Sequence, residues 1–507
     1  MNINTEIKKL VEYGKKKYFI TNEDEIYIIN QILSILNLVD YEDIAGEFPI
    51  EPVEDILNRI RSWAAVNNVV ENDSNELLDL LDTKIMGIFA SKPSEFRKQF
   101  FDCYKESPLK ATEFYYDYAK NINYIREQRV AKDIKWVHET PYGNLDMTIN
   151  LSKPEKDPRA IALSAKVSSN YPKCLLCKEN EGYAGRLDHP ARQNHRIVPI
   201  TLAEEQWFMQ YSPYVYYNEH CIVFKGEHDP MKITKLTIQR LLDFIELFPH
   251  YILGSNADLP IVGGSILTHD HFQGGNYSFA MARAKELNKV HLASVDVEAF
   301  TLQWPMSVIR LKGENPQNLI KVSDQIIKNW KVYSDPEVNI LSHSQGEEHN
   351  TITPITRFRH GKFEVDLILR NNRTSEEHPF GIFHSHKKYH HIKWENIGLI
   401  ECMGLAVLPS RLKTEMALMK EHIKNKSIDA METNEILNKH MNFANEIVEK
   451  YNYLNELEFY KNLDDIVEAE IGEVFYHVLL NCGVFKDTVD GQQAFKKCCE
   501  VMYGNFI

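Results

Sequence analysis

Two histidines and a glutamine alternate within one short segment of the chain. Residues 263–275 read GGSILTHDHFQGG. If residues 266–273 form a strand, His269, His271 and Gln273 line one face at intervals of about 6.6 Å. Two imidazoles and an amide in a row make a poor apolar surface, because each carries polar atoms that need partners. We therefore expect a polar pocket that handles an anion.

Glycines flank this segment on both sides. Gly263 and Gly264 precede it, together with Ser265, and Gly274 and Gly275 follow it. Glycine lets backbone N–H groups approach a ligand closely, and such donors suit phosphate oxygens. The alternative is that the glycines form turns at the two ends of a buried strand. We take Gly264 and Ser265 as candidate substrate contacts.

A neutral histidine is a good nucleophile toward phosphorus and forms a covalent intermediate. One ring nitrogen is held by a hydrogen bond, often to a backbone carbonyl, and the other attacks. A sugar phosphate leaving group needs no strong acid, because its second pKa is about 6. The reaction would then depend on positioning and on donors to the phosphoryl oxygens, and Gln273 is a candidate for one of them.

This segment resembles the active-site strand of the galactose-1-phosphate uridylyltransferases, which belong to the histidine-triad superfamily. The better-known class of that family has His-Pro-His-Gly-Gln, whereas this chain has Asp270 and Phe272 between the shared residues, as in the second, mainly bacterial class. The resemblance implies that His271 is the nucleophile that becomes uridylylated and that Gln273 stabilises the phosphoryl oxygens. It covers most of the chain and extends to residues 174–183, 189–196, 210–220, 369–374 and 391–401.

Cys174 and Cys177 have the spacing of half a zinc site. Two buried thiols in a turn would look the same. The family resemblance adds His228 and His269 as the other two ligands, which would make a closed, four-coordinate and therefore structural zinc site. We expect no organic cofactor.

Three further groups are candidates for substrate binding. Arg186, Arg192 and Arg196 suit phosphate, although surface salt bridges are an equal alternative. By resemblance, Asn256 and Asp258 contact the ribose or the uracil. His384 and His386 share a strand face, and they belong to a second metal site, to a substrate phosphate contact or to the core; we take them as substrate contacts.

The pattern of the whole chain predicts an α+β protein. We expect two histidine-triad-like antiparallel-sheet halves, at 136–290 and 291–412, with helical regions at 1–135 and 413–507. Of the 20 histidines, seven lie between His189 and His271 and eight between His343 and His391, which suggests a duplicated unit. Apolar periodicity predicts a strand at 144–150, β structure at 351–372, and helices at 232–248 and 394–408.

Composition excludes several classes of protein. With 43% hydrophobic and 26% charged residues the chain of 507 residues is not disordered, and a net charge of −14 gives no basic footprint for nucleic acid. No segment has the length of a membrane helix or the pattern of a signal peptide, so we expect a cytoplasmic protein whose eight cysteines are thiols.

The leading hypothesis from the resemblance is an exchange of UMP between UDP-glucose and galactose 1-phosphate. UDP-glucose, UDP-galactose and hexose 1-phosphates would be the ligands, and the resemblance implies a homodimer. A second hypothesis is a dinucleotide phosphorylase or another histidine-dependent nucleotidyltransferase. A third is a non-catalytic, zinc-stabilised binding protein.

Overall fold

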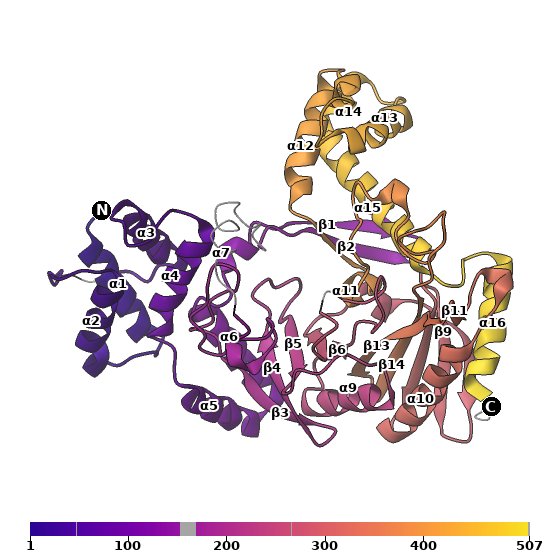
Figure 1. The fold of residues 1–507 in the computed structure, drawn as a ribbon, viewed down its shortest axis with the longest axis horizontal. Coiled ribbons are helices and arrows are strands. Elements are labelled where there is room, and N and C mark those ends of the chain that lie inside the picture. Colours follow the sequence, from indigo (N-terminus) through magenta and orange to yellow (C-terminus); the bar gives the residue numbers. More distant parts are fainter. Residues whose placement is uncertain (47, 153–168, 265, 505–507) are drawn as a thin grey trace. The chain divides into compact units, whose positions relative to one another are not determined.

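The computed structural model describes residues 1–46, 48–152, 169–264 and 266–504. They form two compact units, one made of Met1–Lys132 and Ser152–Asp229, the other of Asp133–Leu151 and Pro230–Ile507. Helices and antiparallel sheets occur in both (Figure 1). The expected α+β class is therefore confirmed. No described helix is long and apolar enough to cross a membrane.

The first unit begins with helices, as the sequence predicts. They are α1 (Ile3–Lys16), α2 (Glu25–Ile35), α3 (Val53–Val66), α4 (Asn75–Gly87), α5 (Pro93–Glu106), α6 (Pro108–Asn121) and α7 (Glu127–Val130). The Ser107 side chain caps α6 by accepting the Lys110 N–H, and Pro108 opens that helix, where its missing N–H costs nothing. Buried aromatic rings of α5 and α6, such as Phe96 and Tyr115, pack edge to face.

The rest of the first unit contains an antiparallel sheet in the order β3 (Val198–Leu202), β4 (Glu205–Tyr211) and β5 (Cys221–Lys225). Tyr115 of α6 donates a hydrogen bond to the carbonyl of Arg196, directly before β3. Tyr211 of β4 donates to the Thr112 carbonyl at 3.0 Å. These buried phenols attach the helical layer to the sheet of the same unit.

The second unit holds a larger antiparallel sheet. Its strands follow in the order β7 (His271–Gly275), β6 (Ile252–Gly254), β13 (Asn350–Arg359), β14 (Lys362–Asn371), β10 (Val308–Gly313), β9 (Val297–Leu302) and β8 (Glu286–Leu292). A smaller sheet joins β1 (Ile134–Thr140) and β2 (Gly143–Ile149) to β15 (Leu405–Leu408), which runs parallel to β2. A short ribbon pairs β11 (His343–Ser344) with β12 (Glu347–Glu348).

The long hairpin of β13 and β14 confirms the β structure predicted at 351–372. It turns at His360 and Gly361, which both have positive φ, as a tight hairpin requires. Across β10, β14 and β13 runs a buried ion ladder, defined as Arg310, Asp366 and Arg357. Arg310 Nε and Nη2 donate to the Asp366 carboxylate at 2.7 and 2.8 Å, and Arg357 pairs with the same carboxylate.

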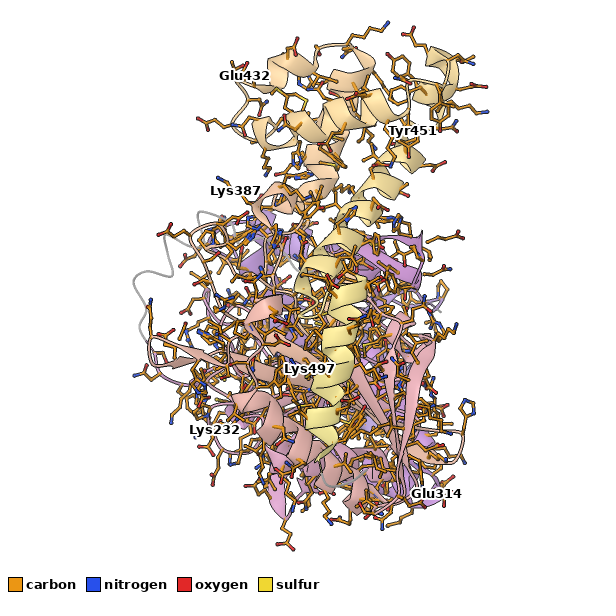
Figure 2. All side chains as sticks on the ribbon, turned by 90° about the vertical axis from the view of Figure 1, so that its right-hand side faces the viewer. Lys232, Glu314, Lys387, Glu432, Tyr451 and Lys497 are labelled. Atoms are coloured by element: carbon orange, nitrogen blue, oxygen red, sulfur yellow. The ribbon has the colours of Figure 1, made fainter. Side chains whose placement is uncertain are left out.

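Helices cover the larger sheet and continue beyond it. They are α9 (Lys235–Leu247), α10 (Pro316–Val332), α11 (Leu399–Cys402), α12 (Arg411–Lys424), α13 (Met441–Lys450), α14 (Glu456–Lys461), α15 (Leu463–Cys482) and α16 (Val489–Tyr503). One hydrophobic core joins α9, α10 and α16 to strands β9, β10, β13 and β14. Figure 2 shows α16, which carries Lys497, lying lengthwise over this core. The predicted helix at 232–248 and the helical C-terminal region are thus confirmed.

Two predicted elements differ from the structure. Residues 394–408 are not one apolar helix, because the chain makes a single turn at α11, turns at Gly404 with a φ of +99°, and then enters β15. The strand predicted at 266–273 begins only at His271. Before it, the Leu267 carbonyl accepts the Met231 N–H at 2.9 Å instead of joining a sheet ladder.

Candidate active site

The strand β7 carries His271 and Gln273 at positions that share a face. β7 pairs with β6 in antiparallel register, with Gly274 opposite Leu253. A Cβ atom on Gly274 would lie 2.2 Å from the Ile252 carbonyl oxygen, so only glycine lets the strands approach this closely. This glycine therefore has a packing role within the strand and does not form a turn at its end.

His271 is held in one orientation and one tautomer. Its Nδ1 lies 2.8 Å from the carbonyl oxygen of His269, and a carbonyl can only accept, so Nδ1 carries the proton. Burial lowers the pKa of His271 to about 4 although the bond to the carbonyl opposes the shift. The ring is therefore neutral near pH 7, and Nε2 bears the lone pair that a nucleophile needs.

Asp270, between the two histidines, is fixed from the other side. Its carboxylate lies 3.1 Å from Nη1 of Arg240 on α9, and both side chains are less than 10% exposed. Phe272, which follows in the same alternation, is fully buried. Asp270 and Phe272, the two residues that depart from the better-known class, thus anchor this histidine segment in the protein interior.

The predicted metal ligands form a group. The ligand atoms of Cys174, Cys177, His228 and His269 all lie within 4.8 Å of one another. The two Sγ atoms are 3.5 Å apart, and Cys177 Sγ is 3.2 Å from His228 Nδ1. Two sulfurs on one tetrahedral zinc ion would be separated by about 3.8 Å, given bonds of about 2.3 Å. The donor set and its spacing therefore fit a four-coordinate metal ion, and the described residues hold no other such group.

Asn256 and Asp258, which the sequence predicts as nucleotide contacts, fix the loop between β6 and β7 through hydrogen bonds. Asn256 Oδ1 accepts the Leu399 N–H at 2.8 Å, at the start of α11. Asp258 accepts the Ile233 N–H at 2.8 Å and the Thr351 hydroxyl at 2.5 Å. A Cβ on Gly264 would lie 2.6 Å from Asn256 Nδ2. Ser265 lies outside the described residues.

The three arginines differ in how much of each guanidinium is already used. Arg196 is buried and donates to the backbone carbonyls of four residues, which are Ala90, Ser91, Gln193 and His195. Arg186 pairs with Asp188 at 2.6 Å and donates to the Tyr183 hydroxyl. Arg192 donates to the neighbouring Ala191 carbonyl and lies over the Tyr124 ring, 5.4 Å from its centroid.

His384 and His386 lie in a coil segment with different surroundings. His384 is 2% exposed, and neither ring nitrogen has a hydrogen-bond partner among the described residues. Burial, followed by the positive charge of Arg370, lowers the pKa of His384 to about 3. His386 stacks on His378 at 4.1 Å and hydrogen-bonds to the Ile382 carbonyl.

Sequence reasoning missed two buried arginines, Arg240, which pairs with Asp270 beside the histidines, and Arg370, whose charge acts on His384. Arg240 interrupts the apolar face of α9, and Arg370 is fully buried in β14, where it donates to the Ile397 carbonyl at 2.9 Å. A charge within a buried periodic face was the available signal, because such a charge requires a partner.

Comparison with known proteins gives one consistent family. The model described as "Galactose-1-phosphate uridyl transferase, N-terminal domain" matches residues 19–230, and the corresponding C-terminal domain model matches residues 244–442. The galactose-1-phosphate uridylyltransferase of Clostridium acetobutylicum is 48% identical over 504 residues, covering 99% of this chain and 100% of the relative. That of Halalkalibacterium halodurans is 49% identical over 505 residues, covering 98% of each.

One solved structure is similar over part of the chain. It is the crystal structure of yeast Ap4A phosphorylase Apa2, with a TM-score of 0.33 and 11% identity, covering 66% of this chain and 95% of the other.

Proposed function

The chain belongs to the galactose-1-phosphate uridyl transferase family, and we propose that it exchanges UMP between UDP-glucose and galactose 1-phosphate with His271 as the nucleophile. It is a nucleotidyltransferase, and the proposal concerns which residues perform the transfer. The single observation that supports this role best is the hydrogen bond of 2.8 Å between His271 Nδ1 and the His269 carbonyl.

In the first half-reaction, His271 Nε2 attacks the α-phosphorus of UDP-glucose. An N–P bond forms, the bond from phosphorus to the bridging oxygen breaks, and glucose 1-phosphate leaves with that electron pair. No proton has to move, because the leaving group is a weakly basic phosphate. The imidazole gains positive charge, and the His269 carbonyl stabilises it through the Nδ1–H bond.

In the second half-reaction, a phosphate oxygen of galactose 1-phosphate attacks the same phosphorus. The N–P bond breaks, UDP-galactose is released and His271 returns as neutral imidazole. Gln273 shares the strand face with His271, and we assign its amide as a donor to the phosphoryl oxygens. Among the three candidate arginines, Arg192 keeps most of its guanidinium uncommitted and is our choice for a substrate phosphate.

We infer that the cluster of Cys174, Cys177, His228 and His269 holds zinc. Two thiolates and two imidazoles fill a tetrahedral shell, so the ion would have a structural role and take no part in the transfer. Its contribution would be to fix the backbone at His269, whose carbonyl orients the nucleophile.

The test is a mass measurement on the protein with uracil-labelled UDP-glucose and no acceptor, after quenching in alkali. We expect one UMP per chain, lost on adding galactose 1-phosphate and absent from His271→Ala. The control is His291→Ala, whose side chain is 54% exposed on β8 and should react normally. UDP-glucose binding without an adduct on the parent protein would refute the assignment of His271.

A further inference from the structure

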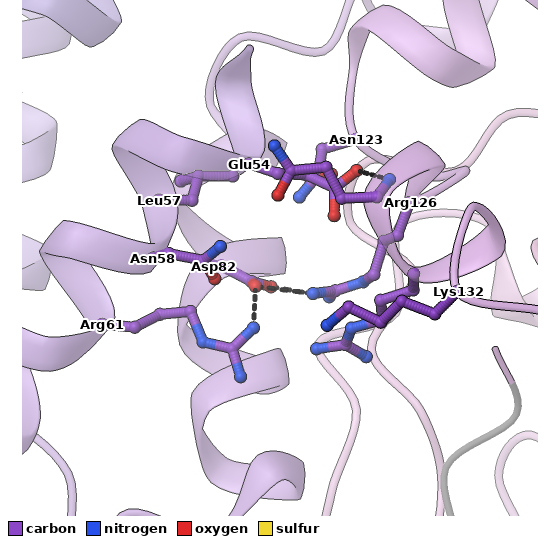
Figure 3. Close-up of a pocket in the computed structure, with 10 residues that line it drawn as sticks. Glu54, Leu57, Asn58, Arg61, Asp82, Asn123, Arg126 and Lys132 are labelled. Carbon is purple, nitrogen blue, oxygen red and sulfur yellow. Dashed lines mark hydrogen bonds and ion pairs between the residues drawn. The ribbon is translucent and has the colours of Figure 1, made fainter. Parts of the chain in front are cut away.

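A small polar cavity lies in the helical part of the first unit, and the proposed transfer does not use it. Its volume is about 60 Å³ (Figure 3). α3, α4, α7 and the segments on either side of α7 supply its walls. Since a cavity needs about 10–15 Å³ for each water, this one has room for about four waters or one small tetrahedral oxyanion.

Positive charge predominates among the residues that line the cavity. Four are cations, namely Arg61, Arg126, Arg129 and Lys132, and two are carboxylates, Glu54 and Asp82. Figure 3 shows Arg61 entering from the side of α3, with Arg126 and Lys132 entering from the opposite side. Glu54 Oε1 accepts the Gln128 N–H at 2.7 Å, and burial raises the pKa of this carboxyl group. The lining therefore favours an anionic ligand.

Ion pairs hold the guanidinium groups in place without exhausting their donors. Arg126 donates to both oxygens of the buried Asp82 carboxylate at 2.7 Å, and Arg61 donates to it at 3.0 Å. Arg129 binds both oxygens of Asp79, which lies beside the cavity. Each guanidinium has five N–H groups, so donors remain after these bonds. Donors fixed in this way lose little conformational entropy when a ligand binds.

Lys132 is the cation that these carboxylates leave unpaired. No carboxylate lies within 4.0 Å of its ammonium in the described part of the chain, although its side chain lines the cavity. An ammonium at the rim of a cationic cavity attracts an anion and can then donate a charge-assisted hydrogen bond to it.

Asn123 adds an acceptor to this set of donors. It is 3% exposed, and its Oδ1 has no hydrogen-bond partner among the described residues. A buried acceptor without a partner requires a donor from elsewhere. An oxyanion that keeps one O–H group would satisfy both Asn123 and the cations, and phosphate below its third ionisation is such an ion.

We propose that this cavity is a binding site for a protonated phosphate group, separate from the site of uridylyl transfer. The phosphate is either the free inorganic ion or the phosphate of a hexose phosphate whose sugar extends outside the cavity. Arg61, Arg129 and Lys132 supply donors to the phosphate oxygens, and Asn123 Oδ1 accepts the P–OH.

The experiment titrates the full chain with inorganic phosphate in a calorimeter at low ionic strength. Lys132→Gln should weaken the binding by about tenfold, because one charge-assisted hydrogen bond is lost, and the exposed position of Lys132 should leave the melting temperature unchanged. Lys105→Gln is the matched control, since Lys105 is an exposed cation on α5 outside the cavity and should bind phosphate like the parent.

Two further titrations identify the ligand. Sulfate, which carries no proton near pH 7, should bind more weakly than phosphate, since it leaves Asn123 Oδ1 without a donor. Glucose 1-phosphate should show the same loss on Lys132→Gln as phosphate if the hexose phosphate is the source, and no such loss if the site takes the free ion alone. The proposal is overturned if phosphate does not bind at millimolar concentration, if Lys132→Gln binds it as tightly as Lys105→Gln does, or if sulfate binds equally well.

Discussion

The ion pair between Arg240 and Asp270 gives the sharpest prediction about the active site. Asp270→Asn keeps the shape of the side chain and removes the charge, which leaves a guanidinium that is 7% exposed facing a neutral amide. Removing one partner of a buried pair costs about 3–5 kcal/mol, because the other charge stays buried. We expect Asp270→Asn to lower the free energy of unfolding by that amount.

The assay is urea unfolding followed by tryptophan fluorescence. Asp102→Asn is the matched control, because Asp102 pairs with Lys105 at 2.7 Å while both side chains are more than half exposed. Breaking such an exposed pair should cost about 0–1 kcal/mol. The double variant Arg240→Met/Asp270→Leu should recover most of the lost stability, since it removes both charges of the buried pair.

Asp270→Asn should also slow the transfer. Asp270 separates His269, whose carbonyl orients the ring, from His271, and a displacement of about 1 Å at the reacting atoms can cost about 100-fold in rate. Single-turnover formation of the UMP adduct measures this step directly. A loss of stability no larger than that of Asp102→Asn, with an unchanged rate, would refute the reasoning.

Three other variants test particular contacts. Burial lowers the pKa of His195 from 6.5 to about 3. Between these two pH values only the unfolded chain binds the proton, so the folded protein loses stability as the pH falls from 6.5 toward 3. His195 contributes about 2 kcal/mol to the loss between pH 7 and pH 5, and in urea unfolding at both pH values the loss should be smaller by that amount for His195→Phe than for the parent, because the other buried histidines titrate in both proteins. Gly264→Ala should lower the free energy of unfolding by about 1–3 kcal/mol because its Cβ would meet Asn256 at 2.6 Å, whereas Gly313→Ala, with its nearest contact at 3.6 Å, should not. Cys174→Ser should lower the melting temperature of the metal-loaded protein to that of the chelated parent, and a parent that chelators leave unchanged would contradict a structural metal.

Local patterns in the sequence were enough to predict the candidate site. The alternation of His271 with Gln273 and the spacing of Cys174 and Cys177 are short-range features, and β7 and the Cys/His group preserve them. Helices such as α9 were predicted for the same reason, because their apolar periodicity reports burial directly.

Contacts between distant segments could not be predicted in this way. The run at 394–408 is apolar enough for a buried helix or a buried strand. Residues 405–408 form the strand β15 because they pair with β2, which lies more than 250 residues earlier in the chain. The partners of Arg240 and Arg370 likewise depend on the fold, since a sequence shows a buried charge only as an exception to the pattern.

The buried ion ladder of Arg310, Asp366 and Arg357 constrains how this sequence can change over evolution. A shift of one residue in the pairing of β13, β14 and β10 would turn Asp366 toward the apolar layer of Val365 and Leu367, so the ladder penalises misregistered hairpins during folding. A mutation of Asp366 removes the carboxylate that Arg310 and Arg357 share, so that Glu286 and Glu364 remain as their carboxylate partners. We therefore expect relatives to keep the three charges together or to replace them together, so that these positions are inherited as a unit.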